Sequence, residues 1–241
     1  MNHRIIAPVF LLAICASSSP CQETSSESAK PVVDTAGAGK PHEGGRILGI
    51  IPNNRTFPSL KNYVPMKASQ KFKIASEDAF DRGTIVMAAA FGGLGQLTNA
   101  NRPFGQGVAG YSRYFGASYG DLVIGDYMTE AIFPTLLHQD PRYFRRGSGS
   151  GWSRAGYAAS QIFRTHRDSG GTQFNYSELL GNSAAVAISN AYYSDNRTAG
   201  NAVSKLGVQL GVDMFGNILK EFWPDLQRKF RRRPALRTPS N

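Results

Sequence analysis

The chain has 241 residues, of which 41% are hydrophobic and 18% charged, and its formal net charge is +10. This length allows one good-sized domain or two small ones, and the hydrophobic content excludes a wholly disordered chain. The positive charge favours anionic partners such as phospholipid headgroups, envelope polysaccharides, nucleic acid or phosphorylated small molecules.

The N-terminal segment predicts export. Arg4 precedes an apolar run over residues 5–13, and small residues follow at 16–18, so residues 1–18 are typical of a signal peptide. Residues 19–45 are rich in Ser, Glu, Gly and Lys and predict a disordered linker. Cys15 and Cys21 are the only cysteines, so the expected fold has no disulfide and no cysteine-ligated metal, and lipidation of either cysteine stays open.

A strap and two helices are expected next. Residues 46–66 contain apolar side chains but also three prolines, which favour an extended strap over a helix. A charged helix is expected over residues 68–80, and Asp81 can cap a second, uncharged helix over 84–98. Because the second helix contains Gly, Gln and Thr, we favour a buried core helix over a membrane span, which would need about 20 apolar residues.

The remainder predicts a bundle of about five to seven helices, mainly α, within residues 46–233. Residues 107–137 form a long central helix with a kink near Pro134, and residues 164–174 a turn or small hairpin. Pro224 is expected to open a last short helix, and residues 234–241 a disordered tail. Further helices are expected over residues 152–163, 176–193 and 200–222.

Two stretches align without a gap and suggest duplicated hairpins. Gly116 and Gly120 match Gly207 and Gly211, and the half-repeats would span residues 84–146 and 177–233. Glycines four apart share one helix face, where a partner backbone can approach closely. The alternative is that two glycine-rich amphipathic helices align by accident.

An arginine-rich loop is the first candidate site. No acidic residue occurs between Pro141 and Arg167, and a Gly-Ser loop leads into a helix. Backbone N–H groups of such a loop, together with guanidinium groups, can bind phosphate or carboxylate. The alternative is a flexible loop with solvated arginines. The predicted anion-binding residues are Arg142, Arg145, Arg146, Gly147, Gly149, Gly151 and Arg154.

Two His-x-Asp pairs are the second candidate. His138 with Asp140, and His166 with Asp168, could supply acid and base groups, with Glu130 as a further carboxylate. No familiar hydrolase or metalloprotease motif accompanies them. A structural role is therefore favoured: the first pair would close the helix end and His166 would lie in a surface hairpin. We assign no metal and no cofactor.

Three phrases carry a resemblance. HQDPRYFRRG at residues 138–147, FNYSELLGN at 174–182 and AISNAYY at 187–193 resemble a set of uncharacterised exported bacterial proteins. The resemblance implies export to the periplasm or outer membrane and transfers no activity.

The sequence favours a non-enzymatic envelope protein that contacts an anionic surface or lipid headgroups, with self-association open. Export argues against nucleic acid as the partner. One alternative is an envelope hydrolase with an arginine-lined site for an anionic substrate. The other is an integral membrane protein whose helices at 84–98 and 179–193 enter the bilayer.

Overall fold

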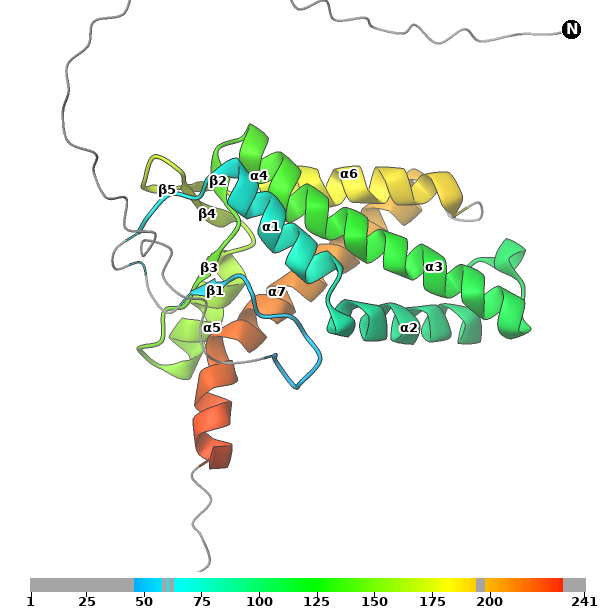
Figure 1. The fold of residues 1–241 in the computed structure, drawn as a ribbon, viewed down its shortest axis with the longest axis horizontal. Helices are drawn as coiled ribbons and strands as arrows, with labels where there is room; N and C mark the ends of the chain where they lie inside the picture. Colours follow the sequence, from blue (N-terminus) through cyan, green and yellow to red (C-terminus); the bar gives the residue numbers. More distant parts are fainter. Residues whose placement is uncertain (1–45, 58–59, 61–62, 194–197, 232–241) are drawn as a thin grey trace, which may run out of the picture. The chain divides into compact units, whose positions relative to one another are not determined.

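The computed structural model describes residues 46–57, 60, 63–193 and 198–231, and this part of the chain is a mainly helical bundle (Figure 1). The predicted fold class is confirmed. The predicted signal peptide 1–18, linker 19–45 and tail 234–241 lie outside the described residues.

The N-terminal strap docks on the bundle through a short strand. Strand β1 (Thr56–Phe57) pairs in parallel with β3 (Tyr143–Phe144), although their first residues are 87 positions apart in the sequence. Ile47 is fully buried, and Arg46 donates to both carboxylate oxygens of Asp81 at 2.8 and 2.5 Å. The strap therefore belongs to the folded body.

Helix α1 (Ala68–Ala79) is followed by a tight helical hairpin. Helix α2 (Arg82–Leu97) begins at Asp81, whose carboxylate accepts from the backbone N–H of Gly83, as predicted for a cap. The short η1 (Arg102–Phe104) turns the chain into α3 (Gly107–Asp126). A methyl group on Gly92 of α2 would lie 2.8 Å from the backbone of Phe115 of α3, so these two helices approach backbone to backbone.

The predicted central helix contains a π-helical segment just before Pro134. After α3 the chain makes a π-helical segment, η2 (Tyr127–Ile132), and then α4 (Phe133–Leu136). Pro134 has no N–H to donate to the preceding turn, and a π segment is one way to absorb that loss. The chain then turns at His138, which has a φ of +52°, into β2 (Gln139–Asp140).

The predicted hairpin at residues 164–174 is confirmed. Strands β4 (Arg164–Arg167) and β5 (Thr172–Phe174) are antiparallel, and β2 adds to them as a third strand. Helix α5 (Gly151–Ser160) precedes them and is capped by Ser150, whose hydroxyl accepts from the N–H of Ser153.

One predicted helix boundary is wrong. Helix α6 (Tyr176–Tyr192) is capped by Asn175 as expected, but α7 (Ala199–Arg231) runs unbroken through Pro224. Because proline has no backbone N–H, one carbonyl in the preceding turn of the helix has no backbone donor. Arg145 and Arg154 donate to the carbonyl of Glu221 in that turn, at 2.7 and 2.8 Å, and so stabilise the helix from outside.

The predicted glycine ridges are not the contact faces. A methyl group on Gly116, Gly207 or Gly211 would meet no atom within 4 Å, and on Gly120 only the Tyr192 hydroxyl at 3.9 Å. Close approach occurs instead at Gly92 and at Gly181 of α6. The two halves are both hairpins, α2–α3 and α6–α7, but they do not share the packing that the alignment implied.

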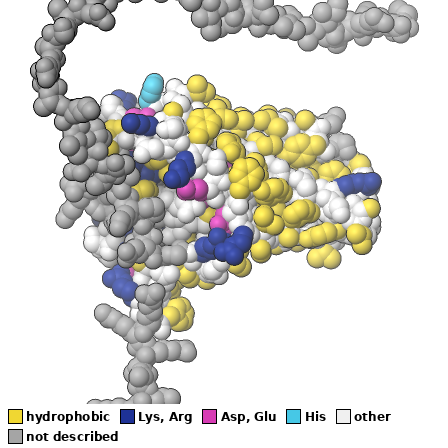
Figure 2. Space-filling view, in the orientation of Figure 1, with side chains coloured by type: hydrophobic (Ala, Val, Ile, Leu, Met, Phe, Trp, Pro, Cys, Tyr) yellow, Lys and Arg dark blue, Asp and Glu magenta, His cyan; other side chains and the backbone are white. Residues whose placement is uncertain are grey.

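Apolar side chains cover much of the outside of the α2–α3 hairpin. Figure 2 shows hydrophobic side chains over the part of the molecule that α2 and α3 form in Figure 1, with the charged side chains gathered mainly elsewhere on this face. Among the described residues, which include the predicted spans at 84–98 and 179–193, no helix is both long and apolar enough to cross a membrane.

Candidate functional site

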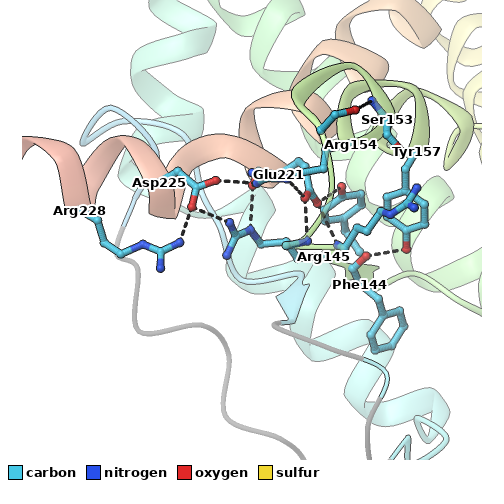
Figure 3. A network of polar contacts seen from close by, with 12 residues as sticks. Phe144, Arg145, Ser153, Arg154, Tyr157, Glu221, Asp225 and Arg228 are labelled. Carbon is cyan, nitrogen blue, oxygen red and sulfur yellow. Dashed lines mark hydrogen bonds and ion pairs between the residues drawn. The ribbon is translucent and has the colours of Figure 1, made fainter.

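The Gly-Ser loop and its arginines surround a carboxylate of the chain itself, that of Glu221 on α7 (Figure 3). The backbone N–H groups of Arg146 and Gly147 donate to its two oxygens at 3.0 and 2.9 Å. The Tyr143 hydroxyl and Nε of Arg154 donate to the same carboxylate at 2.9 and 2.8 Å. Glu221 is fully buried. The loop is therefore an anion cradle, and the anion is internal.

The electrostatics agree with an ionised Glu221. Burial alone would raise the pKa of this carboxyl, but the hydrogen bonds from Arg154, Gly147, Tyr143 and the Arg146 N–H hold it below its usual value. Asp225, one turn further along α7, contacts Arg145 at 3.1 Å and Arg154 at 2.6 Å. Burial would raise the pKa of Asp225 as well, and hydrogen bonds from Arg154 and Arg228 lower it.

The remaining predicted anion-binding residues are also engaged internally. Arg142 donates through Nε and Nη2 to the carboxylate of Asp140, and its guanidinium lies 5.2 Å from the ring centre of Phe144. Arg146 lies over the ring of Tyr157 at 5.9 Å. Gly149 has a φ of +100°, and Gly151 begins α5. The side chains of Arg142, Arg145 and Arg154 are thus paired with carboxylates of the chain, and binding of an external anion at this loop stays a prediction.

The two His-x-Asp pairs do meet, on neighbouring strands. Asp140 lies opposite His166 in the β2–β4 ladder, and the Asp168 N–H donates to the His138 carbonyl at 3.0 Å. Both carboxylates have cationic partners, however: Arg142 for Asp140, and the buried Lys71, at 2.6 Å, for Asp168.

The histidines are not arranged as a catalytic pair. His138 is exposed, whereas His166 is half-buried against the rings of Phe144 and Tyr63, at 5.1 and 6.1 Å between centres. Burial lowers the pKa of His166, which favours the neutral ring. Among the described residues no group of three or more His, Cys, Asp or Glu side chains is placed to hold a metal ion. Glu130, the fifth candidate residue, lines a cavity that none of the other four candidate residues lines.

That cavity, of about 340 Å³, is the most distinctive polar feature of the bundle. Side chains from the strap, α1, α2, α3, η2, α6 and α7 line it, and it adjoins a second cavity of about 480 Å³ with which it shares Gly125, Asn182, Val208 and Gln209. Seven ionisable groups line the first cavity. Five are carboxyls (Asp78, Asp126, Glu130, Glu178 and Asp213) and two are cations (Arg55 and Lys220).

Arg55 from the strap is the main cation of this cavity. Its Nε lies 3.0 Å from Oε1 of Glu130 and 3.6 Å from Oδ2 of Asp78. Although burial opposes it, the charges of Glu130 and Asp78 raise the pKa of Arg55, which stays charged. Arg55 is therefore the cationic partner of the buried Glu130.

Four of the five carboxyls that line the cavity have raised pKa values. Burial, followed in Glu178 by the neighbouring charge of Asp213, raises the pKa of Asp126 to about 7 and of Glu178 to about 8. Burial also raises the pKa of Glu130 and of Asp78. Lys220 moves the opposite way, since burial lowers its pKa to about 8. Groups that titrate near neutral pH in a cavity mark a candidate functional site.

Sequence reasoning missed most of this cavity. Gln209, Asp213 and Asn217 form a stripe spaced by four along α7, which reads as a solvent-facing surface. In the fold this stripe lines the cavity, together with Val208 and Phe215 of the same helix, which are exposed to 68% and 60%. The available signal was the pair Glu178 and Asn182, also spaced by four, on a helix that is otherwise mostly apolar.

No protein-family model, no curated protein and no solved structure matches this chain. Its function is therefore argued from its own geometry.

Proposed function

We propose that this chain is an exported, non-enzymatic module that binds the surface of anionic membranes through its α2–α3 hairpin. The observation that carries the proposal is the composition of that hairpin. Residues 82–120 contain no Asp and no Glu, and their only charged residues are Arg82, Arg102 and Arg113. Each of these arginines is exposed.

The end of the hairpin combines apolar exposure with positive charge. Leu97, the last residue of α2, and Val108, near the start of α3, are exposed to 86% and 85%. Arg102 lies between them in the chain. Apolar surface in water costs about 25 cal/mol per Å², and insertion into the headgroup region recovers that cost, while arginines contact lipid phosphates.

A lipid surface fits this face better than a second copy of the chain. A two-fold symmetric contact brings the same patch against itself, and would place these arginines together with no acid of residues 82–120 to balance them. An anionic bilayer supplies the missing negative charge. The arginines 142–154, which the sequence favoured for this contact, mainly serve the interior, so we move the contact to the hairpin.

Flotation with lipid vesicles tests the proposal. The mature protein should float with vesicles of phosphatidylcholine and phosphatidylglycerol at 3:1, and much less with phosphatidylcholine alone. The double variant Leu97→Asp, Val108→Asp should lose at least ten-fold in bound fraction. The matched control is Leu136→Asp, Val203→Asp, which changes side chains exposed to 67% and 70% on α4 and α7.

The two double variants separate the possible results. Equal loss in both, or no loss in the hairpin variant, overturns the proposal. Light scattering at matched concentration addresses the second copy. A dimer that the hairpin variant dissociates, together with no vesicle binding, would assign the face to self-association and also overturn the proposal.

A further inference from the structure

The interior cavity has more hydrogen-bond acceptors than the chain supplies with donors. Glu130 is fully buried, and although Oε1 lies 3.0 Å from Nε of Arg55, the N–H does not point along this line, so neither carboxylate oxygen accepts a hydrogen bond from the described residues. Asn182 is 1% exposed and its Oδ1 is likewise without a donor. Buried acceptors without donors cost free energy and call for a partner.

The orientation of Asn182 follows from its own donors. Its Nδ2 donates to Oε1 of Glu178 at 3.1 Å and to Oδ2 of Asp213 at 3.2 Å, which joins α6 to α7. Since both N–H groups are used on these acids, the amide oxygen is the free group at a position that lines both cavities. Three acceptor atoms of the cavity, both carboxylate oxygens of Glu130 and Oδ1 of Asn182, thus lack N–H or O–H donors, and one donor, Nε of Arg55, also makes no hydrogen bond.

The charged groups and the volume of the cavity limit which class of ligand could supply the missing donors. Five carboxyls face two cations, so the cavity has an excess of acids. The opposite lining is apolar and includes Met87, Phe91, Val212 and Leu219. A volume of about 340 Å³ is at the lower end of the range for small-molecule sites. No group of three or more potential metal ligands is gathered among the described residues, which favours an organic cation over a metal ion.

We infer that the cavity between α3, α6 and α7 binds an organic cation that carries N–H donors on an apolar body, such as a primary alkylammonium ion. The ammonium group lies against Glu130, Asp126 and the Asn182 carbonyl oxygen, and the alkyl chain lies against the apolar side chains of α2 and α7. This site is separate from the membrane-binding face and does not depend on it.

Because the pKa values of Asp126 and Glu178 are raised, binding of a cation has a second measurable effect, the release of protons. A cation beside Asp126 and Glu178 lowers the pKa of these carboxyls, so that binding near pH 7 releases protons to the buffer. The other ionisable groups lining the cavity are Arg55, Asp78, Glu130, Asp213 and Lys220, and all remain in place in the experiment below.

Calorimetric titration of the full mature chain at pH 7 with three probes tests the site. Octylamine should bind, octanol should bind at least ten-fold more weakly because it has no charge, and octyltrimethylammonium should also be weaker because it has no N–H donor. Repeating the octylamine titration in buffers of different ionisation enthalpy should reveal proton release. Octanol binding as tightly as octylamine overturns the inference, and so does the absence of proton release.

Variants place the binding in the cavity. The double change Asp126→Asn, Glu130→Gln should weaken octylamine binding at least ten-fold, and Asp78, the second carboxylate beside Arg55, remains in place to balance the arginine charge. The control Glu77→Gln alters an exposed carboxylate on α1 and should bind as the parent does. Unchanged affinity in the double variant overturns the inference. Loss of affinity in Leu97→Asp, Val108→Asp would also overturn it, by assigning the amine to the hairpin.

Discussion

Glu221 is the residue on which the arginine-rich region depends. Its carboxylate accepts from Tyr143, Arg154 and two backbone N–H groups, and it has no exposed surface. Replacing one partner of a buried ion pair leaves the other charge uncompensated, which typically costs about 3–5 kcal/mol. We therefore expect Glu221→Gln to lower the free energy of unfolding by roughly that amount, measured by urea denaturation.

The neighbouring Asp225 provides the comparison. It contacts Arg145 and Arg154, but its side chain is 33% exposed, so water can replace part of the interaction. Asp225→Asn should therefore cost clearly less than Glu221→Gln. Equal losses would mean that burial and the two backbone donors add nothing, contrary to the structure.

The sequence predicts which residues of the arginine-rich region donate hydrogen bonds, but it does not predict that Glu221 accepts them. The absence of acids over residues 141–167, together with the Gly-Ser loop, correctly indicates a cradle for an anion. Glu221 lies 74 positions from Gly147, and nothing in a single sequence links them. Arg55, in the proline-rich strap, reaches Glu130 for the same reason: pairing across such distances is determined by tertiary packing.

Glycines at helix contacts distinguish the observed packing from the predicted ridges. A methyl group on Gly92 would lie 2.8 Å from the Phe115 backbone, and on Gly181 it would lie 2.9 Å from the Thr129 methyl carbon. Gly92→Ala and Gly181→Ala should each destabilise the protein by about 1–3 kcal/mol, the usual cost of overpacking. Thermal or urea unfolding of each variant measures this.

Gly116 and Gly211 are the matched positions. They lie inside α3 and α7, with no atom within 4 Å of an added methyl group. Alanine there should be neutral or stabilising by up to about 1 kcal/mol, because alanine favours the helix. If these two substitutions are the damaging ones, the predicted ridges are the real contacts and the structure is wrong at both hairpins.

Local signals explain which elements the sequence could predict. Asp81 and Asn175 start helices where their side chains can cap them. Strands β1, β2 and β3 have two residues each, too short for any alternation of polar and apolar side chains. Helix α7 continues through Pro224, and Arg145 and Arg154, which are distant in the sequence, donate to the Glu221 carbonyl in the preceding turn, a contact that no local rule predicts.

The molecule as a whole places many of its ionisable groups inside and many large apolar groups outside. Ordinary amphipathic reasoning assumes water outside and an apolar core, so it assigns the polar stripe of α7 to solvent. The polar stripe of α7 that lines the cavity and the apolar surface of the α2–α3 hairpin both follow from this distribution of ionisable and apolar side chains. Each points to a partner: a lipid surface for the hairpin and a cation for the cavity.

The buried acids predict an unusual dependence of stability on pH. The pKa of Asp126 rises to about 7 and that of Glu178 to about 8, so the native state binds more protons than the unfolded state up to about pH 8. Stability falls with pH wherever the native state binds more protons. Lys220, with its pKa lowered to about 8, opposes this trend only near and above that pH.

The free energy of unfolding should therefore fall between pH 6.5 and 8.5 by roughly 1–3 kcal/mol. Glu221 and Asp225, whose pKa values are lowered, lose their stabilising effect only as the pH falls into the acid range, and so do not act in this window. Burial lowers the pKa of His166, so this residue changes the free energy of unfolding only below about pH 6.5, the pKa of an unperturbed histidine.

Urea denaturation at the two pH values measures the fall in the free energy of unfolding. The double variant Asp126→Asn, Glu178→Gln should flatten it, whereas Glu77→Gln should leave it unchanged. A parent protein as stable at pH 8.5 as at 6.5 would show that these carboxyls are solvated and that the cavity is not the buried acid cluster described above.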